Sequence, residues 1–337
     1  MMKVLAYVGG EPKLVEREVP AIGGRQLLVA VRYAGLNPAD LMQLAGGYAS
    51  PPGAPADVAG IEVCGTVVAV GPAVSSHAVG DRVFGLVGGG GFAGLVAVDE
   101  DLVTRLPDEL DERTGAAVPE TFITAHDALF TQGELASGER VLIHGGTGGV
   151  GSAAIGLAVL AGAEVFATVR SDAGAELVRS LGARPVSAAD FVADLTALTG
   201  GAAADVIVDL VGAPNYPGNF AVLAHRGRLV SVGLAGGDRV AFSLAALMRV
   251  RGRLIGTVLR SRPYAEKARA VAAFARQVVP HLASGRLRVL IDTVIPIEDF
   301  AAARRRLEAP GKRGNILLDL GAAPAGAIEP IGTAGES

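Results

Sequence analysis

The feature that most constrains the fold of this chain is a glycine-rich loop between an apolar run and an alanine-rich run. Residues 146–151 read Gly-Thr-Gly-Gly-Val-Gly, after the strand-like residues 141–143 and before the helix-like residues 153–160. Such a loop joins a buried strand to a helix, because its first glycine permits a tight turn and its last allows close helix–strand packing. In a chain with 47 glycines the loop alone is a weak signal, but a strand-like run at residues 164–169 completes a β-α-β unit. The pattern predicts an α/β domain with a parallel sheet.

The backbone of this loop is suited to bind an anion. At the start of the helix, unpaired N–H groups and the helix dipole favour negative charge, and the middle glycine lets a pyrophosphate approach the backbone. An ordinary glycine-rich turn is the alternative, which the flanking strands and helix make the weaker interpretation. We therefore predict a dinucleotide site that contains Gly146, Thr147, Gly148, Gly149, Val150 and Gly151.

The end of the next strand indicates which dinucleotide binds. An acidic residue there accepts hydrogen bonds from the adenosine ribose of NAD, whereas an arginine accommodates the additional phosphate of NADP. Here Arg170 and Ser171 follow the strand, and Asp172 is expected to cap the next helix. A solvated surface charge is the alternative interpretation of Arg170. We favour NADPH, with its phosphate on Arg170 and Ser171.

The chain has two parts with different patterns. From about residue 124, strand-like runs alternate with stretches whose apolar residues recur every three or four positions, which predicts a doubly wound parallel sheet. Its six strands are expected at residues 140–144, 164–169, 184–187, 205–211, 228–232 and 253–257. The earlier part contains short Val- and Leu-rich runs separated by Gly, Pro and Asn, which predict a barrel-like β domain. These runs are residues 3–8, 26–33, 62–70 and 81–85.

The end of the chain is expected to return to the first domain. It contains a helical pattern at residues 265–282 and another at 298–307, with strand-like runs at 287–295 and 315–320. Residues 322–337 have no apolar period, so we expect a disordered tail there.

Composition excludes several classes of function. The net charge of −4, with acids and bases interspersed over 337 residues, provides no basic stripe for nucleic acid or for an anionic membrane. The densest apolar run, residues 141–169, is interrupted by glycines and charged residues and could not span a bilayer. The start of the chain lacks the pattern of a secretory signal, so a cytoplasmic protein is expected. The single cysteine, Cys64, lies in an apolar strand-like run and is interpreted as a packing residue.

Several segments resemble a known family. Residues 34–40 (Ala-Gly-Leu-Asn-Pro-Ala-Asp), residues 79–83 (Val-Gly-Asp-Arg-Val), the glycine-rich loop and residues 205–212 are similar to the zinc-free quinone oxidoreductases of the medium-chain dehydrogenase/reductase superfamily. Residues 119–122, 254–262 and 266–269 resemble the branch that contains the tumour-suppressor-induced quinone oxidoreductase and its bacterial relatives.

This resemblance implies an arrangement of domains. It implies a GroES-like catalytic domain built from residues 1–123 and 261–321, a Rossmann domain at 124–260, and a substrate site at their junction. It also implies a homodimer in which the strand at residues 253–257 pairs with its partner-chain copy. Further cofactor contacts are expected from Thr124, Gly233, Leu234, Leu259 and Asn315.

The resemblance also implies that no metal is bound. Zinc-dependent relatives place a cysteine in the segment that matches residues 36–38 and a histidine in a Gly-His-Glu triplet, where this chain has Asn37 and Ile61. Zinc needs three or four N, S or O ligands on one centre. The five histidines are scattered along the chain: His77, His126, His144, His225 and His281.

Two departures from the family concern the predicted sites. Residues 91–95 differ from the usual Gly-Gly-Tyr-Ala-Glu-Tyr, which bears on the substrate pocket. Gly174 and Ala188 stand where relatives often carry a lysine and a tyrosine for the NADP phosphate, so Arg170 and Ser171 must supply that role.

The leading hypothesis is hydride transfer from NADPH to a quinone or an α,β-unsaturated carbonyl. Asn37 and Tyr48 are the candidate catalytic donors, and a turn residue and a half-buried loop aromatic are their respective structural alternatives. The second hypothesis is a reductase of a natural-product pathway that performs enoyl reduction or reductive cyclisation. A non-catalytic NADPH-binding protein is the third.

Overall fold

The computed structural model describes residues 1–321, and these form two compact units. Unit 1 contains residues 1–120, 263–279 and 291–321, and unit 2 contains residues 121–262 and 280–290. The expected disordered tail, residues 322–337, lies outside the described residues. The assignment of residues 1–123 and 261–321 to catalysis and of 124–260 to cofactor binding stays a prediction.

Unit 2 is built on a parallel sheet of six strands in the order β10-β9-β8-β11-β12-β13. The strands are β8 (Arg140–Ile143), β9 (Glu164–Val169), β10 (Arg184–Ser187), β11 (Ala204–Asp209), β12 (Leu223–Ser231) and β13 (Arg253–Gly256). The central residues of β8, β9 and β11 are buried, as expected for strands covered by helices on both faces, whereas the edge strands β10 and β13 are more exposed. The predicted doubly wound parallel sheet is confirmed.

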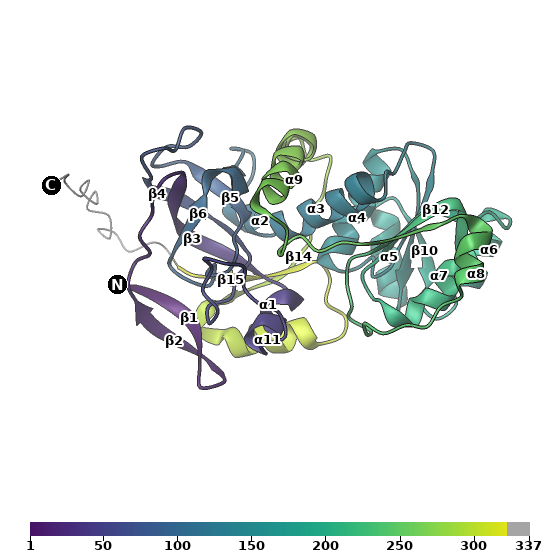
Figure 1. The fold of residues 1–337 in the computed structure, drawn as a ribbon, viewed down its shortest axis with the longest axis horizontal. Coiled ribbons are helices and arrows are strands. Elements are labelled where there is room, and N and C mark those ends of the chain that lie inside the picture. The colour runs from purple at the N-terminus through teal and green to yellow at the C-terminus, as the bar shows by residue number, and fades with distance from the viewer. Residues whose placement is uncertain (322–337) are drawn as a thin grey trace. The chain divides into compact units, whose positions relative to one another are not determined.

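Helices alternate with these strands. The main ones are α4 (Gly149–Leu160), α5 (Asp172–Ser180), α6 (Phe191–Thr199), α7 (Tyr216–Val222) and α8 (Leu244–Val250). Figure 1 shows β10 and β12 of the unit 2 sheet among the helices α5 to α8. Before β8 the chain forms α3 (Pro119–His126), which continues into a π-helical turn at Asp127–Gln132. None of the described helices is long and apolar enough to cross a membrane.

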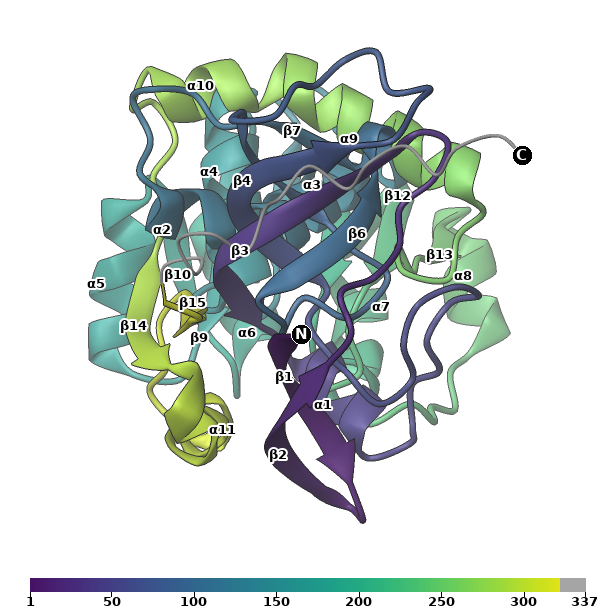
Figure 2. The same cartoon turned by 90° about the vertical axis from the view of Figure 1, so that its left-hand side faces the viewer.

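Unit 1 is β-rich, as the sequence predicts. Figure 2 shows its central strands β3, β4 and β6 lying side by side. Its mixed sheet has the order β14-β15-β3-β4-β5-β7, with β6 also paired to β3. The strands are β3 (Gln26–Leu36), β4 (Glu62–Val70), β5 (Arg82–Leu86), β6 (Leu95–Asp99), β7 (Val103–Arg105), β14 (Ile291–Pro296) and β15 (Asn315–Asp319). Because β15 pairs antiparallel with β3, the end of the chain completes a sheet that its beginning started.

The remaining elements of unit 1 lie around this sheet. A separate hairpin joins β1 (Met2–Val8) to β2 (Glu11–Arg17). The helices are α1 (Pro38–Leu44), α2 (Glu112–Ala116), α9 (Tyr264–Gln277) and α11 (Phe300–Glu308).

Two expected elements near the end of the chain differ in the structure. The single helix expected at residues 265–282 is divided into α9 and α10 (Val279–Ala283). The break falls at Val278, two residues before Pro280, which has no N–H to donate and whose ring clashes with the carbonyl one turn earlier. The strand expected at residues 287–295 begins only at Ile291, and residues 287–290 make no β-sheet pairing.

Candidate active site

The glycine-rich loop connects β8 to α4, as the sequence predicts. Gly148 is the N-terminal cap of α4, and the helical hydrogen bonds begin with the Ser152 N–H, which donates to the Gly148 carbonyl at 2.9 Å. The N–H groups of Gly149, Val150 and Gly151 lie in the first turn of α4. No helical carbonyl precedes them by one turn, so they have no hydrogen-bond partner within the helix. Three backbone donors therefore stand at the positive end of the helix dipole, where a pyrophosphate would bind.

The three motif glycines have different steric surroundings. A Cβ atom on Gly146 would lie 2.7 Å from the Ala167 Cβ, and one on Gly151 would lie 2.1 Å from the Gly145 carbonyl oxygen. A Cβ on Gly148 would meet nothing closer than 3.5 Å. Packing therefore requires the outer glycines, whereas the space beside Gly148 is open to a ligand.

Thr168, at the end of the neighbouring strand β9, holds the loop from one side. Its hydroxyl accepts a hydrogen bond from the Gly145 N–H at 3.0 Å, and its carbonyl accepts one from the Gly146 N–H at 3.3 Å. The loop is thereby fixed to β9 as well as to β8. This order lowers the entropy that ligand binding would otherwise cost.

A buried polar network holds the loop from the other side. His144 Nε2 lies 2.7 Å from Asn219 Oδ1, and Asn219 Nδ2 donates to Asp209 Oδ2 at 2.8 Å. Burial lowers the pKa of His144, so the ring is neutral at pH 7. Since the Asn219 oxygen faces it, Nε2 carries the proton.

The same Asp209 shapes the loop after β11. Its Oδ1 accepts hydrogen bonds from the N–H groups of Val211 at 2.8 Å and Gly212 at 2.9 Å. One buried carboxylate therefore connects the loops at the ends of β8 and β11. The sequence prediction missed this network, although polar residues that end two apolar runs are a recognisable signal.

The residues predicted to bind the NADP phosphate lie at the end of β9. Arg170 is exposed, and its side chain has no partner among residues 1–321. Ser171, not Asp172 as expected, caps α5: its Oγ accepts from the Gly174 N–H at 3.2 Å. Serine caps better here because its short side chain reaches back to the first turn from the last extended residue. A Cβ on Gly174 would lie 3.2 Å from the Thr147 Cγ2, so α5 begins directly against the glycine-rich loop.

Other predicted cofactor residues occupy both units. In unit 2, the Gly233 N–H donates to the Asp209 carbonyl at 3.1 Å, Leu234 is exposed, and Leu259 is buried. Thr124 lies half-buried on α3. Asn315 belongs to β15 of unit 1, where its amide donates to the Ala117 carbonyl at 3.0 Å.

Asn37, one of the two candidate catalytic residues, is held by buried carboxylates in unit 1. Its Nδ2 donates to Glu62 Oε1 at 2.7 Å, and its backbone N–H donates to Asp40 Oδ2 at 2.8 Å. Asp40 also accepts from the Gly60 N–H at 2.8 Å. The amide of Asn37 therefore has a fixed orientation at the start of α1.

Glu62 is the residue that sequence reasoning missed at this place. Its second oxygen accepts the Glu120 N–H at 2.8 Å, and burial raises the pKa of its carboxyl to about 7. A Cβ on Gly35 would lie 1.9 Å from Oε1, so glycine at that position makes room for the carboxyl group. A lone glutamate at the start of an otherwise apolar strand is the signal that could have identified it.

Tyr48, the second candidate, lies between α1 and β4 and is half-buried. Ile61, at the position where zinc-dependent relatives carry a histidine, is buried. In the described part of the chain, no group of three or more His, Cys, Asp or Glu side chains is placed to hold a metal ion. Cys64 is buried in β4, and burial raises the pKa of its thiol.

Two family models match this chain. One, described as zinc-binding dehydrogenase, covers residues 149–276, and the other, described as the GroES-like domain of alcohol dehydrogenase, covers residues 23–108. A quinone oxidoreductase of Mus musculus is 30% identical over 329 residues, which are 94% of this chain and 97% of that protein. The chain belongs to the medium-chain dehydrogenase/reductase superfamily, in its quinone oxidoreductase branch. Its fold is the NAD(P)-binding fold of that superfamily.

A second kind of relative is much longer. A mycocerosic acid synthase-like polyketide synthase of Mycolicibacterium smegmatis is 32% identical over 312 residues. These residues are 90% of this chain but only 14% of the synthase.

Solved structures of both kinds share the fold. A quinone oxidoreductase of Pseudomonas syringae is 29% identical with a TM-score of 0.85, over 95% of this chain and all (100%) of that one. A mycobacterial protein complexed with NADPH is 26% identical with a TM-score of 0.83, over 94% and 99%. The CurK enoyl reductase is 26% identical with a TM-score of 0.79, over 94% and 98%. The predicted combination of GroES-like and Rossmann folds is confirmed.

Proposed function

We propose that this protein is an NADPH-dependent, zinc-independent reductase that transfers hydride to a quinone or an α,β-unsaturated carbonyl. The observation that carries the proposal concerns the edge of the unit 2 sheet at which its parallel strands have their C-terminal ends. There, an open glycine-rich loop lies beside β9, which is followed by the exposed Arg170 and not by an acid. A relative of 26% identity that was solved with NADPH supports the same choice of cofactor.

The nicotinamide, when bound, supplies the hydride, and the residues of unit 1 must support the acceptor. Hydride addition to a conjugated carbonyl develops negative charge on oxygen, which hydrogen-bond donors stabilise. We assign this role to the Tyr48 hydroxyl and to the Asn37 amide. The amide carries two hydrogens and gives one to Glu62, which leaves the other for a ligand. Glu62 acts as a positioning residue for Asn37.

The proposed cofactor site is tested by reversing the charge at the end of β9. Arg170→Asp should weaken NADPH binding by roughly 1 to 3 kcal/mol, the scale of a charge-assisted hydrogen bond to a phosphate, with much less effect on NADH. Titrations of cofactor fluorescence measure both affinities. Arg179→Asp, at the other end of α5, is the matched control and should leave both unchanged. Equal losses for the two cofactors in Arg170→Asp would show that Arg170 does not bind the phosphate.

A second candidate function is enoyl reduction or reductive cyclisation in a natural-product pathway. The similarity to a polyketide synthase and to the CurK enoyl reductase favours it. The two candidates differ in the acceptor, so kcat/KM should be compared between simple quinones and enoyl thioesters. A strong preference for the thioester, or a cyclised product, would support this second function. Tight NADPH binding without turnover of any acceptor would instead indicate a non-catalytic binding protein.

The proposed partners are a small-molecule acceptor and a second copy of the chain. No role for nucleic acid or membrane is proposed, since the net charge is −4 and basic residues form no stripe along the sequence. A cytoplasmic homodimer completes the proposal. Its expected contact is the edge strand β13, which pairs with only one strand, β12, in the described structure.

A further inference from the structure

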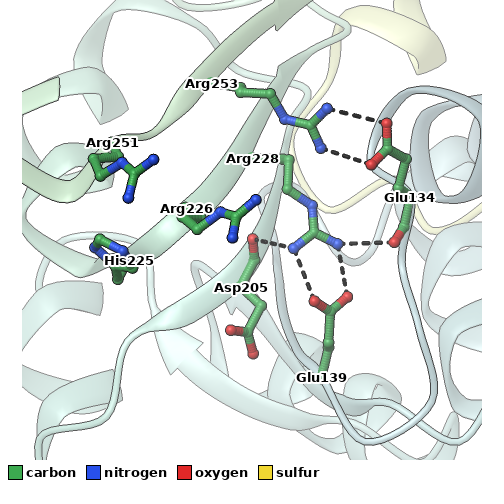
Figure 3. A pocket seen from close by; sticks show the side chains of 8 residues that line it. All are labelled: Glu134, Glu139, Asp205, His225, Arg226, Arg228, Arg251 and Arg253. Atoms are coloured by element: carbon green, nitrogen blue, oxygen red, sulfur yellow. Dashed lines mark hydrogen bonds and ion pairs between the residues drawn. The ribbon is translucent and has the colours of Figure 1, made fainter. Parts of the chain in front are cut away.

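Unit 2 has a hollow at the end of its sheet opposite to the glycine-rich loop. It lies where β11, β12 and β13 begin, and its volume is about 620 Å³ (Figure 3). Ionisable side chains line it: Glu134, Glu139, Asp205, His225, Arg226, Arg228, Arg251 and Arg253. The proposed oxidoreductase function uses none of them.

Two ion pairs form one wall of this hollow. Arg228, which is buried, donates to both oxygens of Glu139 at 2.8 and 2.7 Å and to the Gly133 carbonyl at 2.7 Å. Arg253 donates to both oxygens of Glu134 at 3.0 and 2.8 Å. These arginines are neutralised within the wall, so their charge is not left for a ligand.

The other two arginines of the hollow, Arg226 and Arg251, carry positive charge that no carboxylate among the described residues neutralises. Figure 3 shows His225 and Arg251 away from the two ion pairs and Arg226 between them and Arg228, and no interaction joins any of the three to a carboxylate. All three side chains are exposed, and within residues 1–321 none has an ion-pair or hydrogen-bond partner. Asp205 is the only remaining lining carboxylate, and its Oδ2 already accepts the Arg140 N–H at 2.8 Å. The hollow therefore contains two guanidinium groups without a partner in the described part of the chain, and its one remaining carboxylate, that of Asp205, already accepts a hydrogen bond.

The backbone conformation at Arg226 and Arg251 is one that disfavours a side chain such as arginine. Among the described residues, the only non-glycine residues with positive φ are Glu134 (48°), Arg226 (60°) and Arg251 (51°), and all three line this hollow. Left-handed backbone disfavours side chains with a Cβ, and glycine occupies every other such position of residues 1–321. Strain of this kind concentrates at binding sites, where the surrounding structure maintains it.

We propose that this hollow, the basic pocket, binds a compact small molecule that carries two or more phosphate or carboxylate groups. Guanidinium groups match the planar and tetrahedral oxyanions of such groups through paired hydrogen bonds. The volume lies within the range of about 300 to 1,000 Å³ that is usual for small-molecule sites. His225 provides a further hydrogen-bond donor at the rim.

Calorimetric titration tests this site in full-length protein saturated with NADPH, so that the cofactor site is already filled. The probes are inorganic pyrophosphate and, separately, citrate, which distinguish phosphate from carboxylate ligands. We expect saturable binding of at least one probe, and at least about a tenfold loss of affinity in Arg226→Gly/Arg251→Gly. The same variant should melt about 2 °C higher, because glycine relieves the left-handed strain. A purely structural role for the two arginines would lower the melting temperature instead.

Two further variants make the test decisive. Arg179→Ala/Arg276→Ala removes two exposed arginines outside the basic pocket and should bind the probe like the wild type. If the glycine variant does not fold, Arg226→Asn/Arg251→Asn replaces it, since asparagine tolerates left-handed backbone. Absence of binding of both probes to the wild type, or equal binding by the wild type and the pocket variant, would overturn the proposal. These outcomes are independent of whether any acceptor is reduced.

Discussion

At the scale of single residues, the surroundings of the Glu62 carboxyl move its pKa into the neutral range. It is almost fully buried, yet it accepts hydrogen bonds from Asn37 and from the Glu120 backbone, which favour its ionised form. Burial is the larger effect and raises its pKa from 4.5 to about 7. At neutral pH the carboxyl beside Asn37 is therefore a mixture of protonated and ionised forms.

This raised pKa makes a signed prediction about stability. Folded protein holds the Glu62 proton more tightly than unfolded chain, so its contribution is complete below about pH 4.5 and is lost as pH rises through about 7. A shift from 4.5 to about 7 corresponds to about 3 kcal/mol. Relative to Glu62→Gln, whose side chain does not titrate, the wild type should lose stability across that interval.

Melting temperatures of the two proteins between about pH 4 and pH 8.5 measure this difference. The exposed Glu176→Gln on α5 is the control and should follow the wild type at every pH. Parallel curves for the wild type and Glu62→Gln would show that folding does not raise the pKa of the Glu62 carboxyl.

The Tyr48 hydroxyl is predicted to act on enones more than on quinones. Tyr48→Phe should lower enone turnover by about tenfold to a hundredfold, the effect of losing one transition-state donor or acid, while NADPH affinity is retained. Quinone reduction should suffer less, because water can protonate the stable hydroquinone anion. Steady-state kinetics with both acceptors measure this, and Tyr264→Phe on α9 is the matched control. Unchanged enone turnover in a correctly folded Tyr48→Phe would remove Tyr48 from the mechanism.

At the scale of elements, different glycines of the glycine-rich loop are expected to serve cofactor binding and the stability of unit 2. Gly148→Ala places its methyl group in open space and should weaken NADPH binding by about tenfold or more, with little change in melting temperature. Gly151→Ala drives its methyl group into the Gly145 carbonyl oxygen, so it should destabilise unit 2 itself. Cofactor titration and thermal unfolding of both variants give the comparison. The same loss of stability in both would mean that the site beside Gly148 is not open.

The sequence predicts the bounds of an element well where a single run of residues is set off by turn residues on both sides. The bounds of β4, β9 and β10 agree with the predicted runs, and β4 and β9 are apolar stretches between turn residues. The strands β2, β6 and β7 were missed, since β2 is largely exposed and β7 is only three residues long. Their pairing comes from neighbours distant in the chain, which local periodicity does not encode.

The same limit applies to the site. The glycine-rich loop was predictable because its function lies in consecutive residues. The pair Asn37–Glu62 and the network His144–Asn219–Asp209 join residues that are 25 and 75 positions apart, so only the fold brings them together. Burial of those groups, which sets their pKa values, is likewise a property of the folded chain.

At the scale of the whole molecule, we predict a dimer that forms through β13. Exposed apolar side chains lie on or beside this edge strand: Leu254 is 37% exposed, Val258 48% and Met248 74%. Light scattering should give twice the chain mass of 34.0 kDa for the wild type. Leu254→Glu/Val258→Glu should give the monomer mass, because like charges would meet across the pairing edge. Val79→Glu, in unit 1, should remain dimeric, and a dimeric Leu254→Glu/Val258→Glu would locate the interface elsewhere.

The central claim is that this chain transfers hydride from NADPH without a metal. It is tested most directly by following NADPH absorbance after exhaustive chelation, with an enone and a quinone as acceptors and elemental analysis of the same sample. Because no described cluster of side chains can ligate zinc, we predict full turnover of at least one acceptor with substoichiometric zinc. Activity that disappears with a stoichiometric metal and returns when zinc is added back would contradict the account.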